Sequence, residues 1–249
     1  MKQPNEIIND VLYFSEKKDN FSSNYLSVRV KEERILTDKE VELLPTTLKN
    51  NKNYTEWRLR KKSSKRFINY LANKKSSICV LDIGCGNGWF SNKIALLEHT
   101  IVDGIDVNQE ELEQAARVFK KENLRFIYAD LFESTSAFEN KYDIVTLNAS
   151  VQYFEDIEQL ILVLKSFLKP QGEIHILDSP FYENSKIEAA KQRTKEYYKS
   201  LSAPEMSSFY YHHSKDTFKD ATVLYSPKKS ILERLFTPKD IPFYWIKIN

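Results

Sequence analysis

The sequence predicts an α/β protein with a doubly wound, mostly parallel seven-stranded sheet and helices on both faces. Three observations lead to this fold class. Short apolar runs alternate with amphipathic segments through residues 53–180, a glycine-rich loop follows the first run, and acidic residues end or follow the next two. Strands alternating with helices at this spacing form parallel sheets, whose ligands bind at the carboxyl ends of the strands.

Seven short apolar segments, bounded by polar or turn residues, are expected to be strands. They are Ile78–Ile83, Thr100–Asp106, Leu124–Tyr128, Tyr142–Leu147, Glu173–Leu177, Thr222–Tyr225 and Phe243–Ile248. Lys169–Gly172 predicts a stop and a turn before the fifth of these strands.

Helices are expected between the strands. The predicted helices are 53–73, Trp89–Leu97, a segment that begins after Asn108, Ile157–Leu168, Ser185–Leu201 and the short Ile231–Phe236. In the segment after Asn108, Leu112, Ala115 and Phe119 share one face, which predicts burial against the sheet. Asn108 and Glu111 have the spacing of a reciprocal helix cap.

The chain divides into an extension and a main domain. Residues 1–52 are interpreted as an N-terminal helical cap, with helical stretches at Asn5–Lys17 and Asp38–Leu44. Residues 53–249 form the main domain. Residues 181–220 are long for one connection between strands, and long excursions of this kind often form lids or substrate walls.

The composition favours a cytoplasmic globular protein. The 249 residues fit one α/β domain with extensions, and 41% are hydrophobic. The net charge of only +2 disfavours a dedicated nucleic-acid binder. Apolar stretches are too short to cross a bilayer, and Met1–Asn9 lacks the apolar core of a signal peptide. Only two cysteines occur, Cys79 and Cys85, so a structural disulfide is not expected.

Three of the five glycines fall together, at Gly84, Gly86 and Gly88, in a loop that follows a strand and opens a helix. Such a loop lets a ligand approach the backbone closely. A dinucleotide fingerprint requires a further glycine where this chain has Trp89, which disfavours a nicotinamide oxidoreductase. Asp82, just before the loop, suits a ligand with an amine better than one with a pyrophosphate.

Further polar residues stand at the ends of the later strands. Asp106 ends the second strand, where a carboxylate can accept hydrogen bonds from a ribose diol. Val107 beside it offers an apolar surface to a purine. Asp130 follows the third strand and could accept from an exocyclic amine of adenine; a solvated loop acid is the alternative. Asn148 ends the fourth strand, where it either faces the ligand or serves only the turn.

In this order, Leu81–Gly88, Gly104–Val107, Tyr128–Leu131, Tyr142–Asn148 and Leu168–Ile176 resemble the class I S-adenosylmethionine-dependent methyltransferases. The resemblance covers roughly residues 53–180, and the last strand fits the antiparallel edge strand of that family. It implies S-adenosylmethionine as cofactor and S-adenosylhomocysteine as product.

The resemblance also implies roles for single residues. Those assigned to the cofactor are Asp82, Gly84, Gly86, Asn87, Gly88, Asp106, Val107, Asp130, Leu131, Asn148, Ala149 and Tyr153. The loop and Asp82 would hold the methionine part, Asp106 the ribose, and Asp130 the adenine amine. Residues 148–150 would line the sulfonium end, and Tyr54 and Arg58 are candidates for the cofactor carboxylate.

Methyl transfer is an in-line displacement that depends mainly on alignment, and a base is needed only if the acceptor must lose a proton. Candidate bases are His212, His213 and Asp178; an exposed loop is the alternative for the histidine pair. His99 and His175 are interpreted as structural, and no metal site is expected. Seven aromatics could wall an acceptor pocket or belong to the core: Phe181, Tyr182, Tyr197, Tyr198, Phe209, Tyr210 and Tyr211.

The favoured function is therefore methyl transfer to a small molecule. The alternatives are an RNA or protein methyltransferase and a non-catalytic S-adenosylmethionine-binding domain. An Asn-Pro-Pro-Tyr tetrapeptide after the fourth strand would favour methylation of amino groups on bases or glutamine, but this chain reads Asn148-Ala149-Ser150-Val151 there. The acids at positions 82, 106 and 130 argue against a silent domain.

Overall fold

The structure is a computed structural model that describes residues 3–17, 19–74, 76–218, 221–227 and 240–249. Its strands are β1 (Glu6–Ile8), β2 (Val11–Tyr13), β3 (Ile78–Ile83), β4 (Thr100–Asp106), β5 (Leu124–Tyr128), β6 (Tyr142–Asn148), β7 (Leu168–Leu177), β8 (Thr222–Tyr225) and β9 (Trp245–Ile248). Its α-helices are α1 (Asp19–Lys31), α2 (Asp38–Leu43), α3 (Tyr54–Ala72), α4 (Trp89–Ile94), α5 (Gln109–Val118), α6 (Ile157–Phe167) and α7 (Ile187–Ser200). Short 3₁₀ helices are η1 (Thr135–Ala137), η2 (Val151–Tyr153), η3 (Asn184–Lys186), η4 (Pro204–Phe209) and η5 (Lys215–Phe218).

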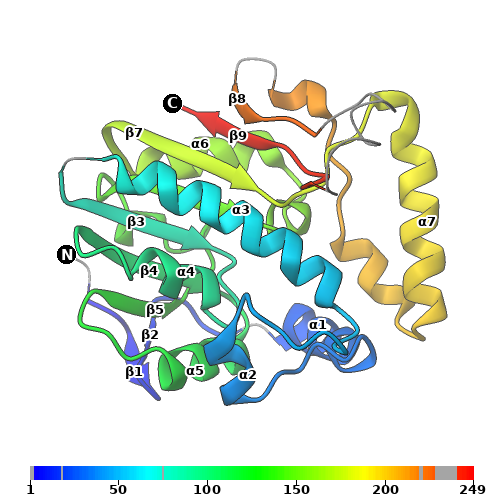
Figure 1. Cartoon of the computed structure of the whole chain (residues 1–249), viewed down its shortest axis with the longest axis horizontal. Helices are drawn as coiled ribbons and strands as arrows, with labels where there is room; N and C mark the ends of the chain where they lie inside the picture. The colour runs from blue at the N-terminus through cyan, green and yellow to red at the C-terminus, as the bar shows by residue number, and fades with distance from the viewer. Residues whose placement is uncertain (1–2, 18, 75, 219–220, 228–239) are drawn as a thin grey trace.

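All strands join one sheet in the order β1-β2-β5-β4-β3-β6-β7-β9-β8 (Figure 1). The six strands from β2 to β7 in this order are parallel, whereas β1 and β9 run antiparallel to their neighbours. The chain builds outward from β3 to β5 and then crosses back to β6, so strand order reverses beside β3. A ligand site is expected at that reversal, at the carboxyl ends of the strands.

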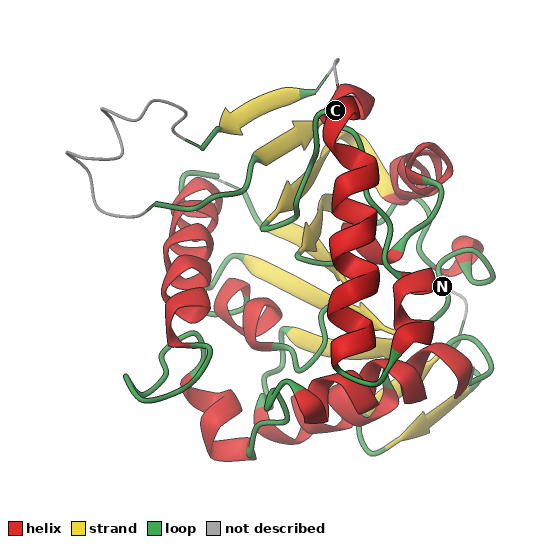
Figure 2. Cartoon of the chain, turned by 90° about the vertical axis from the view of Figure 1, so that its right-hand side faces the viewer, coloured by secondary structure: helices red, strands yellow, loops and turns green. Residues whose placement is uncertain are grey.

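Helices cover both faces of the sheet, as the doubly wound fold requires (Figure 2). On one face, Phe67 of α3, Ile94 of α4 and Leu112 of α5 belong to a single buried cluster. On the other face, Leu160 and Leu164 of α6 pack over the sheet. The fold class expected from the sequence is confirmed, and all seven expected strands are present.

The N-terminal segment differs from the expectation. Asn5–Lys17 is not helical, because residues 6–13 form a hairpin of β1 and β2 that extends the sheet to nine strands. Asn9 and Asp10 have φ angles of 49° and 65°. Positive φ at both residues is typical of the two-residue turns that connect the strands of tight hairpins. The signal was an Asn-Asp pair, typical of such a turn, between the apolar residues Ile7–Ile8 and Val11–Tyr13.

Two other boundaries differ, and one expectation lies outside the described residues. Lys169–Gly172 is part of β7 rather than a turn before it, although Gln171 has a φ of 67° and the register against β6 shifts near Tyr142. An irregularity within the pairing accommodates the Pro-Gly segment without ending the strand. The helix expected at Ile231–Phe236 falls among residues that the structure does not describe.

Helix α7 stands away from the sheet, across from the carboxyl ends of its strands, with α1 beside its C-terminal end (Figure 1). The two helices are joined by contacts. Lys31 Nζ donates to the carbonyl of Ser202 at 2.9 Å, and the Tyr197 hydroxyl donates to Glu32. A small apolar cluster of Val28, Tyr198 and Met206 lies between them. The space at the strand ends is therefore walled on the far side.

Candidate active site

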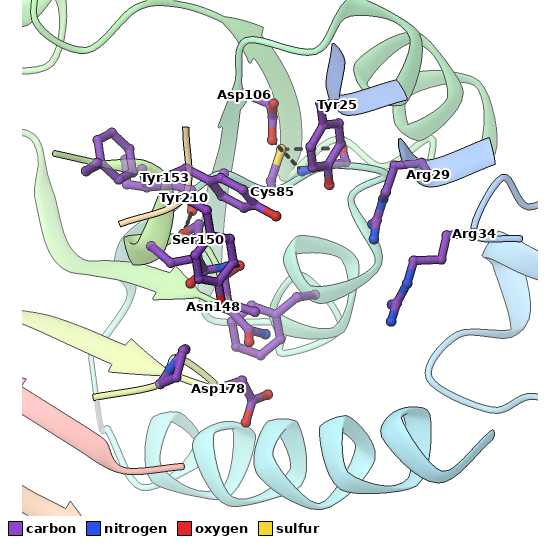
Figure 3. Close-up of a pocket in the computed structure, with 18 of the residues that line it drawn as sticks. Tyr25, Arg29, Arg34, Cys85, Asp106, Asn148, Ser150, Tyr153, Asp178 and Tyr210 are labelled. Carbon is purple, nitrogen blue, oxygen red and sulfur yellow. Dashed lines mark hydrogen bonds between the residues drawn. The ribbon is translucent and has the colours of Figure 1, made fainter. Parts of the chain in front are cut away.

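A cavity of about 1060 Å³ lies between the carboxyl ends of the strands and the wall formed by α1 and α7. Residues that follow β3, β4, β5, β6 and β7 line one side, and residues of α1, α3 and α7 line the other. The cavity therefore sits where the reversal of strand order predicts a ligand site. Figure 3 shows Asn148 and Asp178 on the strand side and Arg29 and Arg34 across from them.

The three loop glycines have different structural roles. All have positive φ, at 69° for Gly84, 52° for Gly86 and 73° for Gly88. A Cβ on Gly84 would lie 2.5 Å from Ser150 Cβ, so this glycine allows the loops after β3 and β6 to meet. A Cβ on Gly88 would lie 2.5 Å from the ring of Phe126. Gly84, Gly86 and Asn87 line the cavity, whereas Gly88 serves packing beneath it.

Asp106 is anchored by the backbone at the end of β4. Its Oδ2 accepts from the amide of Gly86 at 2.8 Å, and its Oδ1 accepts from the amides of Val107 and Asn108 at 2.8 and 2.9 Å. Burial raises the pKa of Asp106 above its usual value, although the hydrogen bonds from these amides act in the opposite direction. Asp106 and Val107 both line the cavity, so a fixed carboxylate and an apolar side chain are presented together.

Asp82 lies deeper, at the base of the cavity. Its carboxylate accepts from Ser91 Oγ at 2.6 Å and from Thr146 Oγ1 at 2.9 Å, and the residue is 1% exposed. Burial raises its pKa to about 6, against the two hydroxyl hydrogen bonds. The side chain thereby ties α4 and β6 to β3 and adds negative charge beneath the glycine loop.

Asp130 and Leu131 line the cavity where β5 ends. Asp130 Oδ1 accepts from the amide of Phe132 at 2.9 Å, and the amide of Asp130 donates to Ser15 Oγ at 2.9 Å. Because Ser15 directly follows the N-terminal hairpin, the hairpin helps to hold this loop in place.

Asn148, Ala149 and Tyr153 line the cavity beyond β6, as expected for residues near a reacting group. Asn148 Oδ1 is buried and has no hydrogen-bond partner within the described chain. Ala149 has a φ of 57°, a strained conformation for a residue with a Cβ. A buried carbonyl oxygen without a donor costs free energy, so Asn148 is suited to a ligand that donates.

Asp178 occupies the equivalent place after β7. It is 7% exposed, has a φ of 51°, and lines the cavity. Its Oδ2 lacks a hydrogen-bond partner among the described residues. Burial raises the pKa of Asp178 to about 6, although Arg60 and Ser63 on α3 act in the opposite direction. The strand end therefore presents a carboxylate that gains and loses a proton near neutral pH.

Helix α1 contributes residues that sequence reasoning missed. Arg29 Nη2 lies 3.7 Å from Glu111 Oε1, and its guanidinium lies 5.1 Å from the ring centre of Tyr25. The Tyr25 ring in turn meets Tyr153 edge to face at 5.8 Å. All four residues line the cavity. The polar sequence of α1 has no motif that marks it as part of a site; only the fold brings it there.

Helix α3 lines the cavity with residues other than the expected pair. Tyr54 and Arg58 do not line it, whereas Glu56 and Arg60 do. Glu56 accepts from both terminal nitrogens of Arg34, at 3.0 and 2.6 Å, and from Arg60 Nε at 2.9 Å. One carboxylate thus holds two guanidinium groups at this wall.

Five of the seven aromatics named from the sequence line the cavity: Tyr182, Tyr197, Tyr198, Phe209 and Tyr210. Phe181 instead packs against Phe218 in the core. Tyr211 lies outside the lining, with its hydroxyl toward Glu155.

Neither His212 nor His213 lines the cavity. His213 is buried, with Nε2 at 3.2 Å from the carbonyl oxygen of Val151. His212 lies behind the wall, with Nε2 at 2.8 Å from the hydroxyl of Thr194, which does line the cavity. Burial lowers the pKa of both imidazoles.

Two other histidines are held structurally. His175 is fully buried in β7, where Nδ1 accepts from Trp245 Nε1 at 3.1 Å and Nε2 lies 3.2 Å from Glu173. His99 Nε2 lies 3.2 Å from the carbonyl oxygen of Leu71. Within the described residues, no cluster of metal-binding side chains occurs, and no helix is long and apolar enough to cross a membrane.

Comparison with known proteins gives a consistent result. A family model described as a methyltransferase domain matches residues 74–236. Malonyl-[acyl-carrier protein] O-methyltransferase 2 of Ilyobacter polytropus is 32% identical over 107 residues, covering 42% of this chain and 40% of that protein. A ubiquinone biosynthesis O-methyltransferase of Erwinia tasmaniensis is 32% identical over 110 residues, covering 43% and 44%. The chain thus spans less than half the length of these relatives.

Solved structures share the fold at lower identity. A chain from the Haloferax volcanii complex of the Trm112 methyltransferase activator superposes with a TM-score of 0.57, at 14% identity and with 93% of this chain and 98% of that chain covered. Phosphoethanolamine N-methyltransferase 2 of Haemonchus contortus, in complex with S-adenosyl-L-methionine, gives a TM-score of 0.52 at 19% identity, with 82% and 43% covered.

Proposed function

The chain belongs to the methyltransferase domain family, and from this premise we propose that it transfers a methyl group to a small-molecule acceptor bound between the ends of β6 and β7 and the wall of α7. It is an S-adenosylmethionine-dependent enzyme. The acceptor, the residue roles and the use of a base are proposals.

The residues of the cavity fit S-adenosylmethionine. A Cβ at Gly84 or Gly86 would lie within 2.9 Å of a neighbouring side chain, so neither position has room for a side chain. The loop therefore presents its backbone to the cavity. Asp106 supplies a fixed carboxylate for a diol, and Val107 with Leu131 supplies apolar contact for a purine. Asn148 Oδ1 is a buried acceptor that no described residue donates to, and an ammonium or hydroxyl group would satisfy it.

S-Adenosylmethionine, when bound, supplies a methyl carbon activated by the adjacent sulfonium charge. The contribution of this chain is to align the acceptor and exclude water. The aromatic side chains of α7 and η4 would hold the acceptor body, and the fixed acids at β3 and β4 would keep the cofactor in one orientation.

Asp178 is proposed to accept the proton of the acceptor nucleophile. The single observation that carries this assignment is its Oδ2, which is buried at the cavity wall and has no hydrogen-bond partner in the part of the chain that the structure describes. A carboxyl group with a pKa of about 6 is ionised at neutral pH and is close enough in pKa to act as a base. The strained φ at Asp178, paired with that at Ala149, indicates that the site maintains this geometry at a cost.

A small acceptor is favoured over a polymer by the wall that stands opposite the strand ends. Contacts of Lys31 with Ser202 and of Tyr197 with Glu32 join α1 to the α7 region across its far side. The names of the curated relatives describe O-methyltransferases. An oxygen nucleophile is therefore proposed. We propose a hydroxyl group in particular, because a hydroxyl must lose a proton, which Asp178 is placed to accept, whereas a carboxylate would need no base.

The test is methyl transfer from labelled S-adenosylmethionine to a panel of small hydroxy compounds, read as labelled product and released S-adenosylhomocysteine. Titration calorimetry with S-adenosylhomocysteine precedes the panel, with micromolar binding expected. Cofactor binding together with labelled small-molecule product supports the proposal. Product found only with RNA or protein substrates would refute the acceptor assignment, and no binding heat would refute the cofactor site.

A further inference from the structure

One face of α7 forms the wall opposite the strand ends. Ala190, Arg193, Thr194, Tyr197 and Tyr198 line the cavity and follow the spacing of a single helical face. Four of these five side chains carry no charge, and two of the four are aromatic. Arg193 therefore places one positive charge on a wall that is otherwise suited to an uncharged body.

The arginines that line the cavity differ in how their charge is used. Arg29 is paired with Glu111, and Arg34 and Arg60 share Glu56. Arg193 makes no hydrogen bond or ion pair with the described part of the chain. Its guanidinium is thus the one among these four whose charge is not neutralised by a carboxylate of the described residues.

Polar groups near Arg193 could complete a binding site. Tyr182 lines the same end of the cavity, and Thr194 lies next along the helix. Burial raises the pKa of the Tyr182 hydroxyl, while the positive charge of Arg193 acts to lower it. The acids of the cofactor site, in contrast, lie within β3, at the end of β4 and just after β5.

We infer that the acceptor is a hydroxy acid: an aromatic or aliphatic body lies against the tyrosines of α7 and η4, and its anionic group pairs with Arg193. This inference rests on the proposed function and narrows its substrate class. The guanidinium group of an arginine binds a carboxylate or phosphate by paired, charge-assisted hydrogen bonds. A neutral amide in place of the anion cannot form that ion pair. Arg193 acts as a specificity residue, separate from the proton acceptor Asp178.

The test uses the full chain saturated with S-adenosylhomocysteine, so that no turnover is needed. The probes are 4-hydroxybenzoate, 4-hydroxycinnamate and 3-hydroxydecanoate, each compared with its neutral amide by titration calorimetry. At least one acid is expected to bind about tenfold more tightly than its amide, the scale of one charge-assisted pair. Arg193→Gln should remove that preference, and Arg193→Lys should restore part of it.

Lys195→Gln is the matched control, because it removes the same charge from α7 at a position outside the cavity lining. It should keep the preference for the acid. Equal binding of all acids and amides by the unmodified chain would overturn the inference, as would an unchanged preference in Arg193→Gln. These outcomes leave the proposed function standing if S-adenosylhomocysteine binds, whereas absent S-adenosylhomocysteine binding contradicts the function itself.

Discussion

The ends of β4 and β7 both present a buried aspartate to the same cavity, but the two carboxylates are held differently. Asp106 accepts from three backbone amides. Asp178 keeps one oxygen without a partner in the described chain and has a strained backbone. The first carboxylate is fixed before a ligand arrives, and the second retains capacity for a proton or a hydrogen bond from one.

The surroundings of the two acids differ less sharply than the acids themselves. Near Asp106, Glu111 pairs with Arg29, but Arg29 Nε and the buried Asn108 Nδ2 have no hydrogen-bond partner among the described residues. Near β6 and β7, the buried Asn148 Oδ1 and Asp178 Oδ2 lack a partner among the described residues, and across the cavity the exposed Arg193 on α7 lacks a counter-charge among them. Buried polar groups left unpaired cost stability and are therefore retained where a ligand will satisfy them. Substitution of Asn148 or Asp178, whose buried oxygens face the proposed acceptor, should therefore affect turnover most.

The largest effect is expected where the cofactor half depends on packing. Gly88→Ala would place a methyl group 2.5 Å from the Phe126 ring at a φ of 73°. Strain and overpacking together should cost about 2–6 kcal/mol of unfolding free energy, measured by urea denaturation. Gly86→Ala is the comparison, because its methyl group would meet only the flexible end of Glu111. An equal loss of stability in both variants would contradict the packing role of Gly88.

Asp178→Asn should lower turnover about 100- to 10,000-fold, the range for loss of a general base, while S-adenosylhomocysteine affinity stays within about twofold. With a pKa of about 6, Asp178 is protonated at lower pH, so kcat/KM of the unmodified enzyme should fall as pH drops through 6 and level off above it. The variant should lack this limb of the profile. An unchanged profile in Asp178→Asn would assign the proton to another group.

Asp106→Ala should weaken S-adenosylhomocysteine binding by about 1–3 kcal/mol through loss of charge-assisted hydrogen bonds. Calorimetry measures this directly. Glu110→Gln, an exposed acid on the neighbouring helix, serves as the control for net charge. Unmodified affinity in Asp106→Ala would remove the ribose assignment and with it the contrast between the two halves.

The smallest effect is expected at His212, one of the bases proposed from the sequence. Its ring lies behind Thr194 and does not line the cavity, so His212→Gln should change turnover by less than about threefold if Asp178 takes the proton. A large fall in turnover with unchanged cofactor affinity would instead return the base to the histidine. A fall in both would indicate a role in holding the wall.

The core of the fold was predictable because each strand combines an apolar run with a turn or a cap. Ile78–Ile83 leads into a glycine loop, which a tight turn requires. Asn108 caps its helix, accepting from the amide of Glu111 at 3.0 Å. The reciprocal half of the expected cap is absent, because the Glu111 side chain faces Arg29 instead. The strand-end positions of Asp82 and Asp106 follow from the same pattern, since parallel strands end at one edge.

The opposite wall was not predictable in the same way. Arg29 and Arg193 come from helices far apart in the sequence, and their approach depends on how α1 and α7 pack rather than on any local motif. The hairpin at residues 6–13 was missed because two three-residue strands carry too short a pattern to outweigh a helical reading.

That hairpin also determines which strand lies at this edge of the sheet. Without it, β5 would present its backbone N–H and C=O groups as an open edge, and open edges template pairing between chains. The hairpin covers β5 and leaves only the three residues of β1 at the margin. Shortening the chain by its first 14 residues should therefore produce an aggregating protein, even though no cavity-lining residue would be removed.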